Sequence, residues 1–166
     1  MTTIKPIVEN ILKLFYGNKN QPLHLREIAR QTKLYGQSIT RYLNELEKDK
    51  ILISRREGNL RKYILSNTKK VFALLALLDV NRYEKLPYIR KNAIQSYIHK
   101  LNEKPVFIIL FGSTAKGTYN DSSDIDLLLI TNRKISFENA EKEAEAITCI
   151  KISTFQIIYS NFKKEI

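Results

Sequence analysis

VFIILFGSTAKGTYNDSSDIDLLLI, residues 106–130, is the most informative stretch of the chain, because it joins an apolar strand, a tight turn and two aspartates. The run Val106 to Leu110 is rich in β-branched residues and predicts a strand covered on both faces. Gly112 follows at a strand-to-helix corner and, having no side chain, lets a ligand approach the backbone. The Ser113 hydroxyl and the N–H groups of the next turn are donors that a phosphate requires. We therefore predict a phosphate pocket at Gly112 and Ser113.

Two carboxylates stand close together at the start of the second apolar strand. Asp124 and Asp126 are two residues apart, so their side chains project from the same face of that strand. Like charges at this separation repel each other unless a cation lies between them. Carboxylate oxygens suit Mg²⁺ or Mn²⁺, and substrate phosphates usually complete the coordination of Mg²⁺. The pair, next to the phosphate pocket, predicts a site for a divalent metal and a nucleoside triphosphate.

A phosphate-binding loop of the Walker type is excluded by one residue. Gly112 and Gly117 have the four-residue gap of that motif, but Thr118 stands where the motif requires a Lys that reaches the β and γ phosphates. The predicted nucleotide site is therefore of another kind.

The segment FGSTAKGTYNDSSDIDLLLI resembles the signature of the DNA polymerase beta type nucleotidyltransferases, particularly the small minimal ones of archaea and bacteria. Their pattern is Gly-Ser, a further Gly, and then Ser-Asp-Ile-Asp-Leu, and the match covers residues 111–128. The resemblance implies that Gly112 and Ser113 hold the triphosphate and that the catalytic residues Asp124 and Asp126 bind the metal. It also implies transfer of a nucleotidyl group to a hydroxyl acceptor.

The family also uses a third carboxylate, on the strand after the next helix. Here that strand is predicted at Lys151 to Tyr159, KISTFQIIY, which contains no Asp or Glu. Its polar candidates are Ser153, Thr154 and Gln156. Their neutral oxygens can help to coordinate a metal, but they cannot act as a general base near pH 7. The sequence therefore predicts binding of a Mg-nucleotide with weak transfer, and leaves open whether transfer is catalysed at all.

The N-terminal part of the chain predicts helices and a hairpin in a recognisable order. The expected elements are a helix over residues 4–15, a short strand at 23–24, a short helix from Leu25, a longer helix over 37–48, and a hairpin of 51–56 and 60–65. This order resembles the winged helix-turn-helix domains of bacterial and archaeal transcription regulators.

Polar and basic side chains on the longer helix and on the hairpin suit contacts to base edges and phosphates. The helix presents an outward polar stripe, and basic residues cluster near the tip of the hairpin. The candidates are Gln37, Ser38, Thr40, Arg41, Asn44 and Lys48 on the helix, and Arg55, Arg56, Arg61 and Lys62 on the hairpin. We predict that this part of the chain binds double-stranded DNA.

The predicted fold class is α+β with two domains, a winged helix followed by a nucleotidyltransferase-type mixed β-sheet flanked by helices. We place the winged helix DNA-binding domain at residues 1–66, a linker helix and boundary at 67–87, and the nucleotidyltransferase-like domain at 88–166. Within the linker, residues 79–87 form the least regular stretch. Phe72 and Leu77 widen the apolar surface of the linker helix, and this surplus suits contact with a second subunit in a homodimer.

The net charge of +11 and a pI near 9.7 favour an anionic partner. Most of the excess lies in residues 1–66, which hold 13 Lys and Arg against 6 Asp and Glu. No window holds the roughly 18 apolar residues of a membrane span, and the N-terminus lacks the layout of a signal peptide, so we expect no membrane contact and a cytoplasmic location. Cys149 is the single cysteine, which excludes an intrachain disulfide.

Three functional hypotheses follow from these features. The chain is a DNA-binding regulator whose second domain binds a nucleotide without efficient chemistry, or an active enzyme that nucleotidylates a protein or nucleic acid acceptor. Some minimal nucleotidyltransferases are antitoxins that modify a partner protein, so the resemblance gives the second hypothesis a precedent. The third is a structural module that keeps a relic site. The wing and the missing third carboxylate favour the first hypothesis, and the intact Gly-Ser turn and aspartates favour the second.

Overall fold

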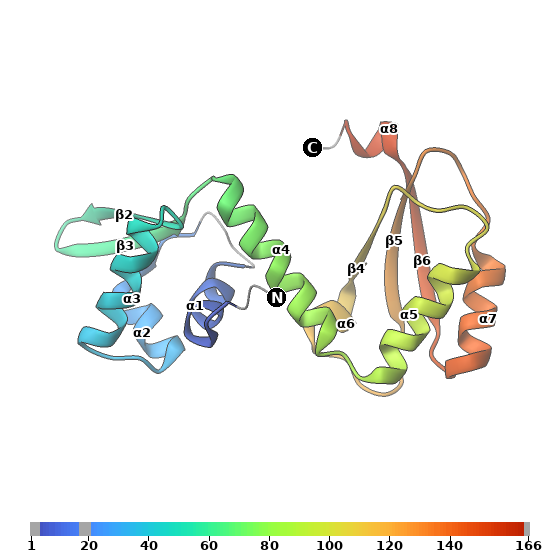
Figure 1. Ribbon diagram of the computed structural model, residues 1–166, viewed down its shortest axis with the longest axis horizontal. Helices are drawn as coiled ribbons and strands as arrows, with labels where there is room; N and C mark the ends of the chain where they lie inside the picture. The colour runs from blue at the N-terminus through green and yellow to red at the C-terminus, as the bar shows by residue number, and fades with distance from the viewer. Residues whose placement is uncertain (1–3, 17–20, 165–166) are drawn as a thin grey trace. The chain divides into compact units, whose positions relative to one another are not determined.

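A computed structural model describes residues 4–16 and 21–164 of the chain. They form two compact units, Met1–Val80 and Asn81–Ile166, each of which is described by itself (Figure 1). The predicted fold class, α+β with two domains, is confirmed. None of the helices in the described parts of the chain is long and apolar enough to cross a membrane.

The first unit has the order of elements that the sequence predicts. It contains α1 (Pro6–Tyr16), β1 (Leu23–His24), α2 (Leu25–Thr32), α3 (Gln37–Lys48), β2 (Leu52–Glu57), β3 (Leu60–Leu65) and most of α4 (Lys69–Glu84). The three strands form an antiparallel sheet in the order β1-β3-β2. Helices α2 and α3, followed by the β2–β3 hairpin, give a helix-turn-helix with a wing.

Local sequence explains the turns of this unit. The chain leaves α2 through Lys33, in the left-handed region at φ 57°, and enters α3 after Gly36 at φ 62°. Gly58, at φ 58°, lies in the tight turn between β2 and β3. Helix α3 buries Ile39, Leu43 and Leu46 on one face, which leaves its polar residues outward.

Helix α4 runs further than the sequence predicts. Residues 79–84 were expected to be irregular, but α4 continues to Glu84, and the division between the units falls inside it. The segment DVNRYE, residues 79–84, contains no Gly or Pro that would end the helix, and Pro87 follows shortly after Glu84. Leu77 packs partly buried against the core of the first unit, whereas Phe72 is 53% exposed, so the homodimer stays a prediction.

The second unit is a three-stranded sheet with helices. It contains α5 (Tyr88–Lys100), β4 (Phe107–Phe111), α6 (Gly112–Lys116), β5 (Ile125–Thr131), α7 (Glu138–Thr148), β6 (Ile152–Ile158) and α8 (Tyr159–Phe162). The strand order is β4-β5-β6, with β4 antiparallel and β6 parallel to the central strand β5. The sheet is therefore mixed, as predicted.

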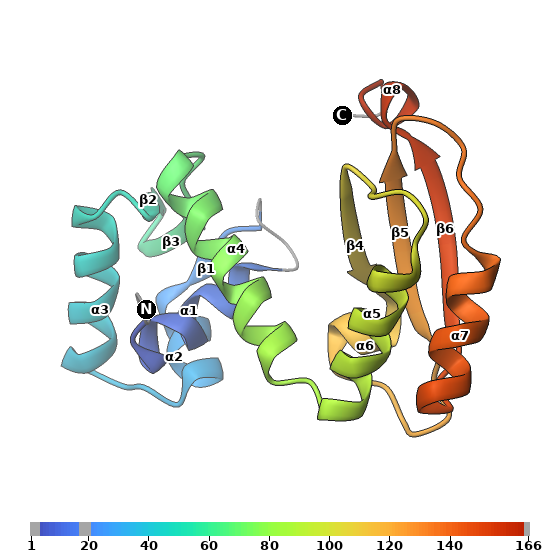
Figure 2. The same ribbon diagram turned by 45° about the vertical axis from the view of Figure 1, so that its right-hand side comes forward.

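Helices α5 and α7 cover one face of this sheet (Figures 1 and 2). The core between the helices and the sheet contains Ala93, Ile94, Tyr97, Ile125, Leu127, Leu129, Ala140, Ala144 and Ile152. On the other face, Phe107, Ile109 and Phe111 of β4 are 37–38% exposed. The prediction that this apolar run is covered on both faces is wrong, because β4 is an edge strand and both long helices of the unit lie on one side.

Candidate functional site

The carboxylate pair, Asp124 and Asp126, lies at the N-terminal end of the central strand. Asp124 directly precedes β5 and Asp126 is its second residue, and both side chains are partly exposed. In the sheet, Asp126 pairs with Phe111 on β4 and with Ser153 on β6. Paired residues of neighbouring strands project from the same face, so these side chains share the face that α5 and α7 leave open.

The phosphate turn, Gly112 and Ser113, lies directly against this pair. Gly112 has φ 68°, and a Cβ built on it would lie 1.9 Å from Asp126 Oδ2. Only glycine fits there, because any side chain would both strain the backbone and displace the carboxylate. The structure thus brings together the Gly-Ser turn and the aspartates that the sequence predicts to act together.

Asp124 is held by two residues from the β6 side of the sheet. The Ser153 hydroxyl donates a hydrogen bond to Asp124 Oδ2 at 3.2 Å, and Lys151 Nζ lies 3.3 Å from the same oxygen. The lysine and aspartate side chains are 61% and 39% exposed, so water and salt screen this ion pair. Sequence reasoning missed Lys151, which directly precedes β6.

Of the three polar candidates for the third-carboxylate position, only Ser153 reaches the site. Thr154 faces the helices, where its hydroxyl donates to Tyr97 Oη at 2.9 Å, and Gln156 donates to Thr131 Oγ1 at 2.8 Å. Burial raises the pKa of Tyr97 to about 12. Within the residues that the structure describes, no group of three or more His, Cys, Asp or Glu side chains could hold a metal.

The oxygen donors present still fit a divalent metal of the Mg²⁺ type. Two carboxylates and the Ser153 hydroxyl are hard oxygen ligands, and Mg²⁺ commonly takes one or two carboxylates and completes its shell with water and phosphate. Sulfur and imidazole ligands, which would favour zinc or copper, are absent from this group. The arrangement can therefore hold a metal together with a phosphate but supplies no third carboxylate as a base.

A buried arginine that the sequence analysis did not identify fixes the loop before Asp124. Arg90, on α5, is 3% exposed. Its guanidinium donates to Thr114 Oγ1 at 2.9 Å and to the carbonyl oxygens of Asn120 and Ser123 at 2.7 and 3.0 Å, and it lies 4.1 Å from the centroid of the Tyr119 ring. An arginine within an amphipathic helix gives no signal of this role, because its partners are 24 to 33 residues away.

The contacts of Arg90 extend to the carboxylate pair through Thr114. Thr114, on α6, is 2% exposed, and its hydroxyl lies 3.4 Å from the backbone oxygen of Asp124. Asn120 closes the intervening turn, since its Oδ1 accepts hydrogen bonds from the hydroxyls of Ser122 and Ser123. The Arg90 guanidinium therefore links α6 to the loop that precedes Asp124.

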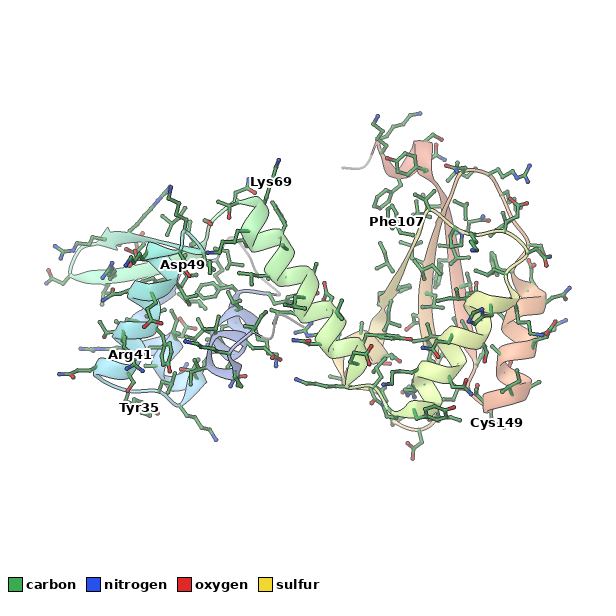
Figure 3. The ribbon with its side chains drawn as sticks, viewed as in Figure 1. Tyr35, Arg41, Asp49, Lys69, Phe107 and Cys149 are labelled. Carbon is green, nitrogen blue, oxygen red and sulfur yellow. The ribbon has the colours of Figure 1, made fainter. Side chains whose placement is uncertain are left out.

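In the first unit, a groove runs along α3 and holds most of its predicted DNA-binding residues. Its lining includes Gln37, Thr40, Arg41, Asn44 and Lys48, together with Arg26 and Tyr35, which the sequence analysis did not single out. Figure 3 shows Arg41 projecting from α3 and Tyr35 from the loop before it. Ser38 is exposed near the start of α3 but does not line this groove.

Strands β2 and β3 form the wing, and two of its basic residues form ion pairs. Arg61 forms an ion pair with Glu47 of α3 at 2.5 Å and donates to Ser54 at 2.9 Å, and Lys62 is paired with Glu57. Arg55 and Arg56 lie opposite Lys62 and Arg61 in the hairpin. Both are exposed and form no ion pair with any residue in the described ranges.

A second recess lies between the start of α2 and the wing. It is lined by His24, Leu25, Arg26, Glu27, Arg30, Asn59, Leu60 and Arg61. Three arginines at its rim add positive charge beside the α3 groove. Arg26 and Arg30 lie on the short α2 helix, where no sequence pattern distinguishes them from ordinary exposed residues.

Comparisons with known proteins agree with part of this picture. No curated protein sequence matches the chain. The solved structure of reduced HlyU from Vibrio cholerae matches with 22% sequence identity, covering 43% of this chain and 75% of that chain at a TM-score of 0.37. Residues 92–166 match the family model described as "Polymerase beta, Nucleotidyltransferase". The part of the chain that holds the phosphate turn and the carboxylate pair is thus similar to the nucleotidyltransferase domain of the polymerase beta family.

Proposed function

We propose that the second unit binds a nucleoside triphosphate with Mg²⁺ or Mn²⁺, the metal at Asp124 and Asp126 and the phosphates at Gly112 and Ser113. The observation that carries this proposal is the contact between Gly112 and Asp126, because it joins a phosphate turn and a metal-binding carboxylate in one place. Both residues lie in the segment that matches the nucleotidyltransferase model.

Each residue of the site has a distinct role in this proposal. The bound metal would neutralise charge on the phosphates. Gly112 leaves room for the carboxylate and for a phosphate, and Ser113 offers a hydroxyl donor. Ser153 orients Asp124 from β6 but cannot accept a proton from an acceptor hydroxyl near neutral pH, so nucleotidyl transfer is expected to be slow.

We further propose that the first unit binds double-stranded DNA through α3 and the wing, which gives a DNA-binding regulator with a nucleotide-binding domain. Support comes from the polar and basic lining of the α3 groove and from the exposed Arg55 and Arg56 on the wing. A helix of this kind suits the major groove, and wing arginines suit the adjacent phosphates.

A second candidate function is active nucleotidyl transfer to a protein or nucleic acid acceptor, as in antitoxins of the minimal nucleotidyltransferase type. The intact Gly112, Ser113, Asp124 and Asp126 favour it, since all four lie together in this structure. In that case the winged helix would locate the acceptor, and a base would have to come from the acceptor complex.

Calorimetric titration of the full chain tests the nucleotide proposal. Wild type should bind ATP or another nucleoside triphosphate in the presence of Mg²⁺, and the double variant Asp124→Asn/Asp126→Asn should lose the metal-dependent part of that binding. Asp121→Asn is the matched control, because Asp121 is exposed on the same loop and lies outside the carboxylate pair. Equal Mg²⁺-dependent binding by wild type and the double variant would refute the metal site.

Labelled nucleotides separate the two candidate functions. The protein is incubated with radiolabelled nucleoside triphosphates, Mg²⁺ or Mn²⁺ and native cell extract. Label that appears in an acceptor, and that disappears with the double variant, supports active transfer. Binding in calorimetry without acceptor labelling supports the regulator.

A further inference from the structure

Two phenylalanine rings lie exposed on the open face of the second unit's sheet. Phe111 of β4 and Phe155 of β6, called here the aromatic pair, are 37% and 57% exposed. Their ring centroids are 5.7 Å apart with an interplanar angle of 59°. Two exposed aromatic rings in contact form a continuous apolar surface, and such surfaces are typical of ligand-binding sites.

The aromatic pair borders the carboxylate pair and the phosphate turn. Phe111 directly precedes Gly112 and lies opposite Asp126 in the β4–β5 register. Phe155 is two residues beyond Ser153, so it projects from the same face as the serine that donates to Asp124. The two rings therefore continue the candidate nucleotide site along the sheet.

The opposite end of the same face is arranged differently. There Phe107 makes an edge contact with Phe162 of α8, with ring centroids 5.4 Å apart. The ring that is distant from the carboxylates thus contacts α8 instead of the aromatic pair, and it remains 38% exposed. Within the described residues, no third aromatic ring contacts the aromatic pair.

We propose that the aromatic pair stacks the base of the nucleoside triphosphate, an inference that rests on the proposed nucleotide-binding function. Phosphates at Gly112 place the remainder of the same molecule beside Phe111, the adjoining residue. Every nucleobase has a flat aromatic face that can stack on a phenylalanine ring. Stacking here therefore provides affinity with little base selectivity. A protein partner or a second copy of the chain would cover the whole apolar face, including Phe107.

The test compares ATP with inorganic tripolyphosphate, which has the phosphates but no base, by calorimetry of the full chain with Mg²⁺. Phe155→Leu and Phe111→Leu should each weaken ATP binding by at least about fivefold, the lower end of the stacking effect per base, and leave tripolyphosphate binding unchanged. Phe107→Leu is the matched control, because Phe107 lies on the same strand and face and is 38% exposed. It should change neither affinity.

A fluorescent reporter gives an independent measurement. The sequence contains no tryptophan, so Phe155→Trp introduces one indole that still offers a stacking surface. Its fluorescence should be quenched by Mg-ATP and unaffected by Mg-tripolyphosphate. Because Phe155 is 57% exposed, Phe155→Trp leaves the core unchanged. Circular dichroism checks the fold.

The outcomes distinguish this inference from the proposed function. Wild type that binds neither ATP nor tripolyphosphate overturns both. Wild type that binds both, with ATP affinity unaffected by Phe155→Leu and Phe111→Leu, overturns the stacking role alone. A dimer in analytical ultracentrifugation that Phe155→Leu and Phe107→Leu weaken equally, with unchanged ATP affinity, assigns the face to a second copy of the chain instead.

Discussion

The Ser153 hydroxyl lies 3.2 Å from Asp124 Oδ2, on the strand that follows α7. By the resemblance to polymerase beta type nucleotidyltransferases, this strand is where a third carboxylate is expected. A neutral side chain therefore stands at the position from which a carboxylate could complete the proposed metal site and accept a proton.

Replacement of Ser153 by Asp should raise nucleotidyl transfer. A missing general base typically lowers a rate by a factor of about 10² to 10⁴, and an acid at this position restores the group that is missing. Thr154→Asp and Gln156→Asp serve as controls, since both side chains face the helices. The measurement is the rate of label transfer in the acceptor assay. Fast transfer by wild type that all three substitutions leave unchanged would mean that the chemistry uses another base.

Gly112→Ala should disable the site more severely than Gly117→Ala. Both glycines have positive φ, 68° and 72°, so each substitution strains the backbone by about 1–2 kcal/mol. A Cβ at residue 112 also meets the Asp126 carboxylate, whereas a Cβ at residue 117 meets nothing within 4 Å. We expect Gly112→Ala to abolish Mg²⁺-dependent nucleotide binding in calorimetry and Gly117→Ala to retain it. Retention by both variants would contradict the close packing of the turn on Asp126.

Arg90→Gln should destabilise the second unit by about 2–4 kcal/mol, because it removes charge-assisted hydrogen bonds to buried oxygens. Lys91→Gln is the matched control, since Lys91 forms an ion pair with the exposed Glu84. It should lower the free energy of unfolding by less than about 1 kcal/mol. Urea unfolding of each variant measures the difference. Nucleotide affinity in the absence of urea gives a second measurement, which should fall for Arg90→Gln because the loop before Asp124 loses its anchor.

Arg55→Gln/Arg56→Gln should weaken DNA binding by the full chain and reduce its salt dependence. Each phosphate contact that is lost should lower the slope of log affinity against log salt by roughly one. Lys5→Gln/Lys69→Gln removes two exposed charges that belong neither to α3 nor to strands β2 and β3, and it should leave the slope unchanged. Fluorescence anisotropy with labelled duplexes at several salt concentrations measures both. Equal slopes for the two double variants would remove the wing from the interface.

The sequence predicted the elements of the first unit well because its local signals agree with each other. The apolar spacing of Ile39, Leu43 and Leu46 defines α3, and Gly36 before it allows the sharp entry. Gly58 determines where the hairpin turns. In the second unit, the motif itself located the phosphate turn and the carboxylate pair, since both lie within one short segment.

The features that sequence reasoning missed depend on pairing between distant segments. Whether Ser153 or Thr154 faces Asp124 follows from the parallel register of β5 and β6, which no local pattern specifies. Arg90 gains its role from partners on a loop that is far away in sequence. The open face of β4 could not be recognised, because an apolar strand looks the same whether one or two layers cover it.

The position of β5 between an antiparallel and a parallel neighbour also sets an order of events during synthesis. β4 and β5 are joined through residues 112–124, which are synthesised together with them, whereas β6 must await the crossover through α7. A nascent chain that ends near Thr131 already contains Gly112 and Asp126, but two strands alone are only marginally stable. We therefore expect the nucleotide to bind only after β6 has docked. A ligand that binds only the completed sheet stabilises that sheet by mass action and so favours the last step of folding.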